Sequence, residues 1–206
     1  MYRTRIKMCG MTRAEDIVYA GMLGVDAIGL IFYPQSARYI NPEQGKAILK
    51  ALPLFVDVIA VFVNPEIELV RHVLAEMPVH YLQFHGDESP EFCSQFSRPY
   101  IKAVPAISVE YLRQEAECHP QADAILLDTP SGSTYGGSGK TFDWEIIPQS
   151  YSKPFILAGG LNAENVRKAT SRAAIYAVDV CSGVELSPGI KDHVKMNQFV
   201  RACCSA

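Results

Sequence analysis

Residues 5–15 read Arg5-Ile6-Lys7-Met8-Cys9-Gly10-Met11-Thr12-Arg13-Ala14-Glu15, and this stretch joins a short strand to the start of a helix. The run from Arg5 to Met8 predicts a strand. Thr12 and Glu15 have the spacing of a capping box, which predicts a helix that ends near Gly24. A strand followed by a helix is the unit of parallel α/β folds, so the fold depends on how often this unit recurs.

The strand signal recurs along the whole chain. Short apolar, β-branched or aromatic runs return at regular intervals, and they are continuous rather than alternating. Such runs are typical of parallel strands that helices cover on at least one face. The eight predicted strands are Arg5–Met8, Ala27–Ile31, Asp57–Phe62, Tyr81–Phe84, Tyr100–Val104, Ala124–Leu127, Pro154–Leu157 and Tyr176–Val180.

Amphipathic segments with helix start signals lie between these runs. A short polar side chain satisfies free backbone N–H groups at the N-cap, and proline fits the first helical position. Asn41-Pro42, Asn64-Pro65 and Ser89-Pro90 are each predicted to open a helix. Further helices are predicted over Ser108–Cys118, Asn162–Ala169 and Asp192–Cys203.

Eight strands alternating with about eight helices are compatible with a closed (β/α)8 barrel or an open doubly wound sheet. An open dinucleotide-binding sheet should carry Gly-x-Gly-x-x-Gly after its first strand, whereas only Gly10 follows Cys9 at once. The sequence therefore predicts an α/β fold, a single (β/α)8 TIM barrel with eight parallel strands. No linker or low-complexity tract divides the chain, so residues 1–206 are expected to form one catalytic domain.

Composition narrows the class of partner. The 206 residues are 49% hydrophobic and 20% charged, and the net charge of −3 comes from well-mixed signs. No basic run suggests a nucleic-acid or membrane-surface partner. No apolar run has the length of a signal peptide or a membrane span, so a cytoplasmic location is expected. The six cysteines show no Cys-x-x-Cys spacing and are expected to be reduced thiols.

Two ionisable side chains end strands at the face where such barrels carry their chemistry. Cys9 ends the first strand, where Lys7 or Arg5 and the following helix start could favour its thiolate; a buried packing thiol is the alternative. Asp128 ends the sixth strand, where desolvation favours the protonated form that a general acid needs. An N-cap or a salt-bridged loop residue is the alternative for Asp128.

The seventh and eighth strands are predicted to end in anion-binding turns. Gly159 and Gly160 precede a helix, and Ser182 and Gly183 form a turn of small residues. Barrels often hold a phosphate through backbone N–H groups at these two positions. Glycine pairs also cap helices, but two of them at the expected strands favour a phosphate site that Cys9 and Asp128 would flank.

Two further residues are candidates for substrate binding. Arg38, in the loop after the second strand, could hold a carboxylate with its planar guanidinium group or could simply be solvated. His85 ends the fourth strand, either as a donor that orients the substrate or as a structural histidine. The five histidines are scattered without a ligand spacing, so no metal site is predicted.

Seven segments together resemble phosphoribosylanthranilate isomerase of tryptophan biosynthesis. The resemblance runs nearly end to end, with the motifs in the family's order. The segments are residues 5–12, Gly29–Arg38, Leu82–Gly86, Gly136–Trp144, Ala158–Leu161, Ser182–Glu185 and Pro188–Asp192.

The resemblance implies a cofactor-free isomerase of the aldose–ketose type that converts N-(5-phosphoribosyl)anthranilate to 1-(2-carboxyphenylamino)-1-deoxyribulose 5-phosphate by an Amadori rearrangement. Asp128 would protonate the ring oxygen, and Cys9 would remove the proton from C2′ as a thiolate. Arg38 would hold the anthranilate carboxylate, and the two turns would hold the phosphate. The loop Gly136–Gly139 is expected to cover this small-molecule site, and a monomer is expected, with a homodimer as the alternative.

Two related enzymes and two non-enzymatic proteins are alternatives to this assignment. The related isomerase of histidine biosynthesis uses an aspartate where this chain has Cys9, and indole-glycerol-phosphate synthase needs catalytic lysines at its strand ends. A non-catalytic phosphosugar-binding barrel or a thiol redox sensor is the alternative from another class. A binding module would be expected to have lost Cys9 or Asp128, and this chain keeps both. A redox sensor would need a second thiol near Cys9, and Cys181, where the family more usually has serine, is the candidate.

Overall fold

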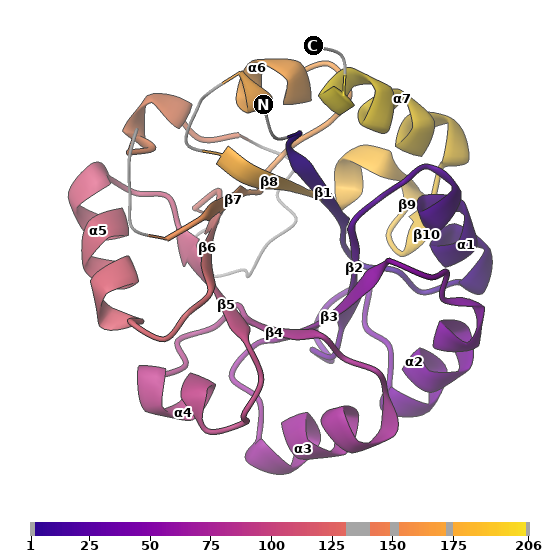
Figure 1. Ribbon diagram of the computed structural model, residues 1–206, viewed down its shortest axis with the longest axis horizontal. Helices are drawn as coiled ribbons and strands as arrows, with labels where there is room; N and C mark the ends of the chain where they lie inside the picture. Colours follow the sequence, from indigo (N-terminus) through magenta and orange to yellow (C-terminus); the bar gives the residue numbers. More distant parts are fainter. Residues whose placement is uncertain (1–2, 131–140, 149–152, 172–174, 205–206) are drawn as a thin grey trace.

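The computed structural model describes residues 3–130, 141–148, 153–171 and 175–204, and it shows a closed ring of eight parallel strands (Figure 1). Each strand pairs with its neighbours in sequence, and the last strand pairs with the first. The predicted (β/α)8 barrel is confirmed. The strands are β1 (Arg5–Met8), β2 (Ala27–Ile31), β3 (Asp57–Phe62), β4 (Tyr81–Phe84), β5 (Tyr100–Pro105), β6 (Ala124–Asp128), β7 (Phe155–Leu157) and β8 (Ile175–Val180).

Helices surround the ring on its outside (Figure 1). The α-helices of the described residues are α1 (Ala14–Met22), α2 (Pro42–Ile48), α3 (Ile67–Glu76), α4 (Pro90–Ser94), α5 (Val109–Cys118), α6 (Val166–Thr170) and α7 (His193–Cys204). Three single turns of 3-10 helix accompany them: η1 (Leu49–Ala51), η2 (Trp144–Ile146) and η3 (Ser182–Val184).

Side chains of the strands alternate between two buried faces, because successive residues of a strand point to opposite sides. On β3, Ile59 and Val61 belong to the apolar cluster inside the barrel. Their neighbours Val58, Ala60 and Phe62 belong to the larger cluster between strands and helices. Both faces exclude water, which explains why the strands read as continuous apolar runs.

The barrel closes where β1 meets β8. Lys7 lies directly opposite Asp179 in this pairing, and the backbone N–H of Cys9 donates to the carbonyl oxygen of Val180 at 2.8 Å. Ile6 and Met8 belong to the outer cluster, so the alternation turns Lys7 and Cys9 toward the inside of the ring. Closure therefore sets the end of β1 beside the end of β8.

Helix starts follow the predicted caps in three cases. Asn41 forms a capping box with Gln44, whereas Ser89 accepts from the N–H of Phe92 and Ser108 from that of Tyr111. In each case a side-chain oxygen satisfies a backbone donor in the first turn.

Three predicted helix starts are wrong. Thr12 does not cap α1, because its hydroxyl donates to the carbonyl oxygen of Gly189 at 2.5 Å, and Arg13 occupies the N-cap without a side-chain bond. Asn64 has a φ of 44° and accepts from the N–H of Asp87, so α3 begins only at Ile67. Thr12 and Asn64 therefore bind partners that are distant in sequence.

The third is the helix predicted from Asn162. The side chain of Asn162 accepts from the N–H groups of Glu164 and Asn165 in a turn, so α6 begins only at Val166.

A small antiparallel hairpin after β8 is absent from the sequence prediction. Its strands are β9 (Glu185–Ser187) and β10 (Ile190–Lys191), and it lies beside α1 (Figure 1), where the N–H of Lys191 donates to Asp16 at 3.2 Å. Segments of three and two residues carry no periodic signal, so the sequence shows only a turn here.

Phe84 is expected to be a large contributor to stability. Its ring is fully buried against those of Phe62, Phe92, Phe96 and Tyr100. Phe84→Ala should lower the free energy of unfolding by about 3–5 kcal/mol, because it removes a large buried group and leaves a cavity. Urea unfolding measures this loss.

Phe55→Ala is the matched control, since Phe55 is 98% exposed, and it should change the free energy of unfolding by less than about 0.5 kcal/mol. Equal losses in the two variants would contradict the packing described for the outer layer.

Candidate active site

A cavity of about 110 Å³ opens at the carboxyl-terminal ends of the strands. It is lined by all the predicted site residues except Gly183, which directly follows one of them: Cys9, Arg38, His85, Asp128, Gly159, Gly160 and Ser182. Residues at the ends of β1, β4 and β6 and in three loops therefore converge on one space.

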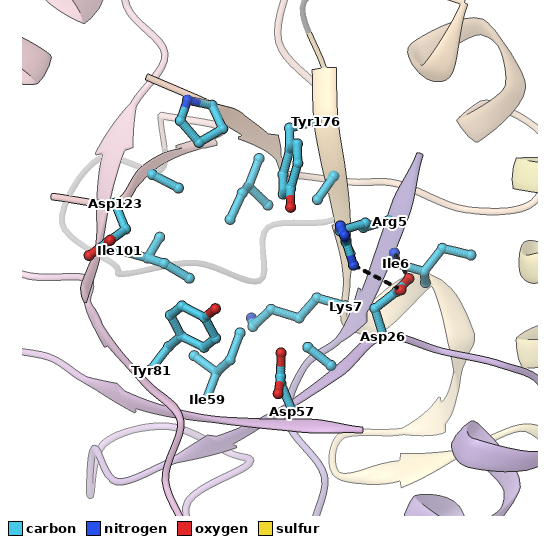
Figure 2. A pocket seen from close by; sticks show the side chains of 15 residues that line it. Arg5, Ile6, Lys7, Asp26, Asp57, Ile59, Tyr81, Ile101, Asp123 and Tyr176 are labelled. Carbon is cyan, nitrogen blue, oxygen red and sulfur yellow. Dashed lines mark hydrogen bonds and ion pairs between the residues drawn. The ribbon is translucent and has the colours of Figure 1, made fainter. Parts of the chain in front are cut away.

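A larger cavity of about 300 Å³ opens at the opposite, amino-terminal end of the barrel (Figure 2). Its walls are isoleucines and alanines, and Asp57, Asp123 and Tyr176 stand around it. Arg5 lies 3.6 Å from Asp26 at its edge. Chemistry in (β/α)8 barrels takes place at the other face, so the smaller cavity is the candidate site.

Cys9 stands above a buried ion pair inside the barrel. Nζ of Lys7 lies 2.7 Å from Oδ2 of Asp179, and both side chains are nearly inaccessible to solvent. Gly29 on β2 leaves room for the thiol, because a Cβ there would lie 2.7 Å from Cys9 Sγ. The thiol is thus fixed on one side by the β2 backbone and approached on another by an ammonium group.

Burial and charge act in opposite directions on Cys9. Burial raises the pKa of the thiol, and the carboxylate of Asp179 raises it too, whereas the Lys7 ammonium, through its charge and a hydrogen bond, lowers it. The net effect is a pKa above the ordinary value. The ammonium predicted to favour the thiolate is present, but burial outweighs its effect on the pKa.

Asp128 is held by two hydrogen bonds. Its Oδ1 accepts from the backbone N–H of Thr129 at 2.8 Å, and its Oδ2 lies 3.1 Å from Nε2 of His85. Nδ1 of His85 is in turn 3.0 Å from Nε2 of Gln83. His85 therefore contacts the predicted acid, and Gln83, buried on the inner face of β4, fixes the imidazole ring.

Arg38 is not free in the loop after β2. Its Nε lies 2.9 Å from one carboxylate oxygen of Glu185, and Nη2 lies 2.7 Å from the other. The hydrogen bonds to Glu185 raise the pKa of Arg38 further, so it carries a full positive charge. A fixed cation therefore stands at one end of the cavity.

The turns after β7 and β8 pack against each other. Gly159 and Gly160 have φ angles of 80° and 63°, a conformation that side chains disfavour. A Cβ on Gly183 would overlap the carbonyl oxygen of Leu161. The two predicted phosphate turns thus form one continuous backbone surface, while the predicted cover, Gly136–Gly139, lies outside the described residues.

Several residues of the site were missed at the level of sequence. Asp179, Glu185, Lys191 and Gln83 are buried polar groups that hold the candidate residues in place. The role of Asp179 follows from the pairing of β1 with β8, so it could be recognised only once the barrel was known to close. Gln83 was detectable as a single polar residue within a strand, as Lys7 was.

The described residues contain no group of three or more histidine, cysteine, aspartate or glutamate side chains arranged to hold a metal ion. All six cysteines are free thiols in this structure. Among the described helices, none combines the length and the apolarity needed to cross a membrane.

The fold and the site define a (β/α)8-barrel enzyme, with a thiol, a carboxyl group and a cation gathered around one cavity at the catalytic face. A family model described as N-(5'phosphoribosyl)anthranilate (PRA) isomerase matches residues 6–202. The chain belongs to the N-(5'-phosphoribosyl)anthranilate isomerase family. The predicted family is confirmed, and the two neighbouring biosynthetic enzymes are set aside.

Relatives agree with this placement over nearly their whole length. An N-(5'-phosphoribosyl)anthranilate isomerase of Legionella pneumophila (strain Paris) is 56% identical over 200 residues, which is 97% of each chain. The crystal structure of phosphoribosyl anthranilate isomerase from Thermotoga maritima superposes with a TM-score of 0.88 at 42% identity, covering 97% of this chain and 98% of that one. A phosphoribosyl anthranilate isomerase in complex with reduced 1-(o-carboxyphenylamino)-1-deoxyribulose 5-phosphate superposes with a TM-score of 0.86 at 37% identity, with the same coverage.

Burial raises the pKa of Cys9 and the Lys7 ammonium group lowers it, and both effects can be tested by titrating the thiol. The thiolate absorbance of the protein, less that of Cys9→Ser, should rise with pH at a midpoint above the ordinary thiol value, because burial dominates. Lys7→Met should move this midpoint higher still, since it removes the cation that favours the thiolate.

Lys102→Met is the control for this titration. Lys102 is also buried and paired with a carboxylate, Glu88, but on the outer face of β5, so its loss should leave the Cys9 midpoint in place. A midpoint in Lys7→Met at or below that of the wild type would contradict the electrostatic account.

Proposed function

We propose that this protein catalyses the Amadori rearrangement of N-(5-phosphoribosyl)anthranilate to 1-(2-carboxyphenylamino)-1-deoxyribulose 5-phosphate, a step of tryptophan biosynthesis. The observation that carries the proposal is the convergence of Cys9 and Asp128 on one cavity between an arginine and two glycine-containing turns. Membership of the isomerase family supports the choice of substrate.

The substrate has an anionic group at each end, and the site offers a matching group for each. The backbone N–H groups of the turns at Gly159-Gly160 and Ser182-Gly183 would bind the phosphate. The guanidinium of Arg38 would bind the anthranilate carboxylate. Anchoring both ends fixes the ribose carbons between Cys9 and Asp128, and such positioning can supply several kcal/mol of the barrier.

Asp128 would open the sugar ring as a general acid. It transfers a proton to the ring oxygen while the bond from that oxygen to C1′ breaks, and the nitrogen lone pair forms the C1′–N double bond of an iminium ion. His85 positions the carboxyl group through its Nε2 contact, and the amide of Gln83 fixes the imidazole in turn.

Cys9 would then remove the proton from C2′ as a thiolate. The bonding electrons form a C1′–C2′ double bond and neutralise the iminium nitrogen, which gives an enolamine that tautomerises to the ketone. Positive charge on the iminium both acidifies the C2′ proton and favours the thiolate, which offsets the effect of burial on Cys9. No cofactor is needed, because the substrate nitrogen supplies and accepts the electron pair.

The non-enzymatic alternatives find less support. Burial raises the pKa of Cys181 to about 12, so the second thiol lacks the thiolate character that a redox sensor requires. A passive phosphosugar-binding barrel would not need the buried groups that hold Cys9 and Asp128. Turnover of N-(5-phosphoribosyl)anthranilate separates this alternative from the isomerase.

Three expectations accompany the proposal. Residues 1–206 form one catalytic domain, the protein is cytoplasmic, and its partner is a small molecule.

A monomer is the expected state, and a homodimer is the alternative. Leu54 and Phe55, which are 85% and 98% exposed in the loop before β3, offer an apolar surface through which a homodimer could form. Sedimentation at two protein concentrations distinguishes the two states.

Cys9→Ser and Asp128→Asn should each lower kcat by about 10²- to 10⁴-fold, because each removes one proton-transfer group. The measurement is steady-state turnover of freshly generated N-(5-phosphoribosyl)anthranilate, followed by the loss of anthranilate-type fluorescence.

Cys118→Ser and Asp57→Asn are the matched controls, since Cys118 is exposed on α5 and Asp57 lines the amino-terminal cavity. Both controls should retain wild-type turnover. A folded wild-type protein without turnover would refute the proposed reaction, and full activity in either site variant would refute the assigned role of that residue.

A further inference from the structure

We infer that Glu185 and Lys191, on the hairpin β9–β10, make the site selective for a substrate that carries a carboxylate. They do so by orienting Arg38 and by leaving it with an uncompensated positive charge. The inference rests on the proposed function, and neither residue has a role in the acid–base chemistry described above.

Glu185 holds Arg38 along one edge of its guanidinium group. An arginine has five N–H donors, and the carboxylate of Glu185 takes one from Nε and one from Nη2. Three donors remain, on Nη1 and Nη2, and in the described parts of the chain no hydrogen bond is donated by Nη1. Because Arg38 lines the cavity, this second edge can bind a carboxylate through two parallel hydrogen bonds.

Lys191 compensates the charge of Glu185. Its ammonium group is fully buried and lies 2.9 Å from a carboxylate oxygen of Glu185. Arg38, Glu185 and Lys191 together carry a net charge of +1. Without Lys191 the remaining pair would be neutral, and a bound carboxylate would lie close to the uncompensated carboxylate of Glu185.

The same ammonium group also binds the backbone of Cys9. Lys191 has three N–H donors, and its other oxygen partners are the backbone carbonyls of Cys9, at 2.5 Å, and Cys181, at 3.2 Å. The carboxylate anchor and the ends of β1 and β8 are thus fixed to one group. A substrate held by its carboxylate is therefore held in register with Cys9.

The test compares two ligands in four proteins. The ligands are reduced 1-(o-carboxyphenylamino)-1-deoxyribulose 5-phosphate and its counterpart made from aniline, which lacks the carboxylate. The proteins are the wild type, Lys191→Met, Glu185→Gln and the double variant. The quantity measured by calorimetry is the ratio of the two dissociation constants, which needs no turnover.

The expected pattern follows the charge count. Lys191→Met should lower the preference for the carboxylated ligand by about tenfold or more, because the cluster becomes neutral. Glu185→Gln should raise it, because the amide oxygen of glutamine still accepts from Arg38 while the cluster then carries +2. The double variant returns to +1 and should regain most of the wild-type preference, which a merely structural role of Lys191 would not produce.

Lys195→Met is the matched control. Lys195 is exposed on α7 and donates only to the backbone oxygen of Glu185 at 2.8 Å, so its loss should leave the preference unchanged. An equal ratio in all folded variants would overturn the inference while leaving the proposed reaction intact. If Lys191→Met fails to fold, the raised ratio expected of Glu185→Gln still decides the test. A wild type that binds neither phosphosugar would instead contradict the proposed function.

Discussion

The ion pair between Lys7 and Asp179 spans the seam at which the barrel closes, and the site depends on this closure. The two residues face each other across β1 and β8, inside a ring whose described core side chains are mostly apolar. Removing one member of a buried ion pair typically costs about 3–5 kcal/mol, because the other charge is left uncompensated. The pair therefore links the first strand to the last, and it holds the ammonium group of Lys7 near the thiol of Cys9.

Charges around the cavity are arranged by pairs that are buried beneath it. Lys7 and Asp179 lie under the thiol, Glu185 and Lys191 lie behind Arg38, and His85 with Gln83 lies behind Asp128. In each case a second group fixes the group that would act on the substrate. Preorganisation of this kind would keep the proposed acid, base and anchor in fixed positions before the substrate arrives.

The sequence predicted where strands lie along the chain better than it predicted contacts between residues that are distant in sequence. All eight strands were found, because a parallel strand covered on both sides leaves a local apolar signal. Thr12 was assigned to a helix cap because its partner, Gly189, lies far away in sequence. The hairpin that carries Glu185 and Lys191 was missed for a related reason, since its strands are too short for a period to show. The candidate acid, base and arginine were found from strand ends, but their partners emerge only when the ring is closed.

If closure of the barrel places Cys9 and Asp128 around a single substrate, a crystal structure of this protein with reduced 1-(o-carboxyphenylamino)-1-deoxyribulose 5-phosphate will show it. We expect the phosphate at the turns of Gly159-Gly160 and Ser182-Gly183, the carboxylate on Arg38, and C2′ within reach of Cys9 Sγ. A ligand bound in the amino-terminal cavity, or one whose phosphate lies on Arg38, would contradict it.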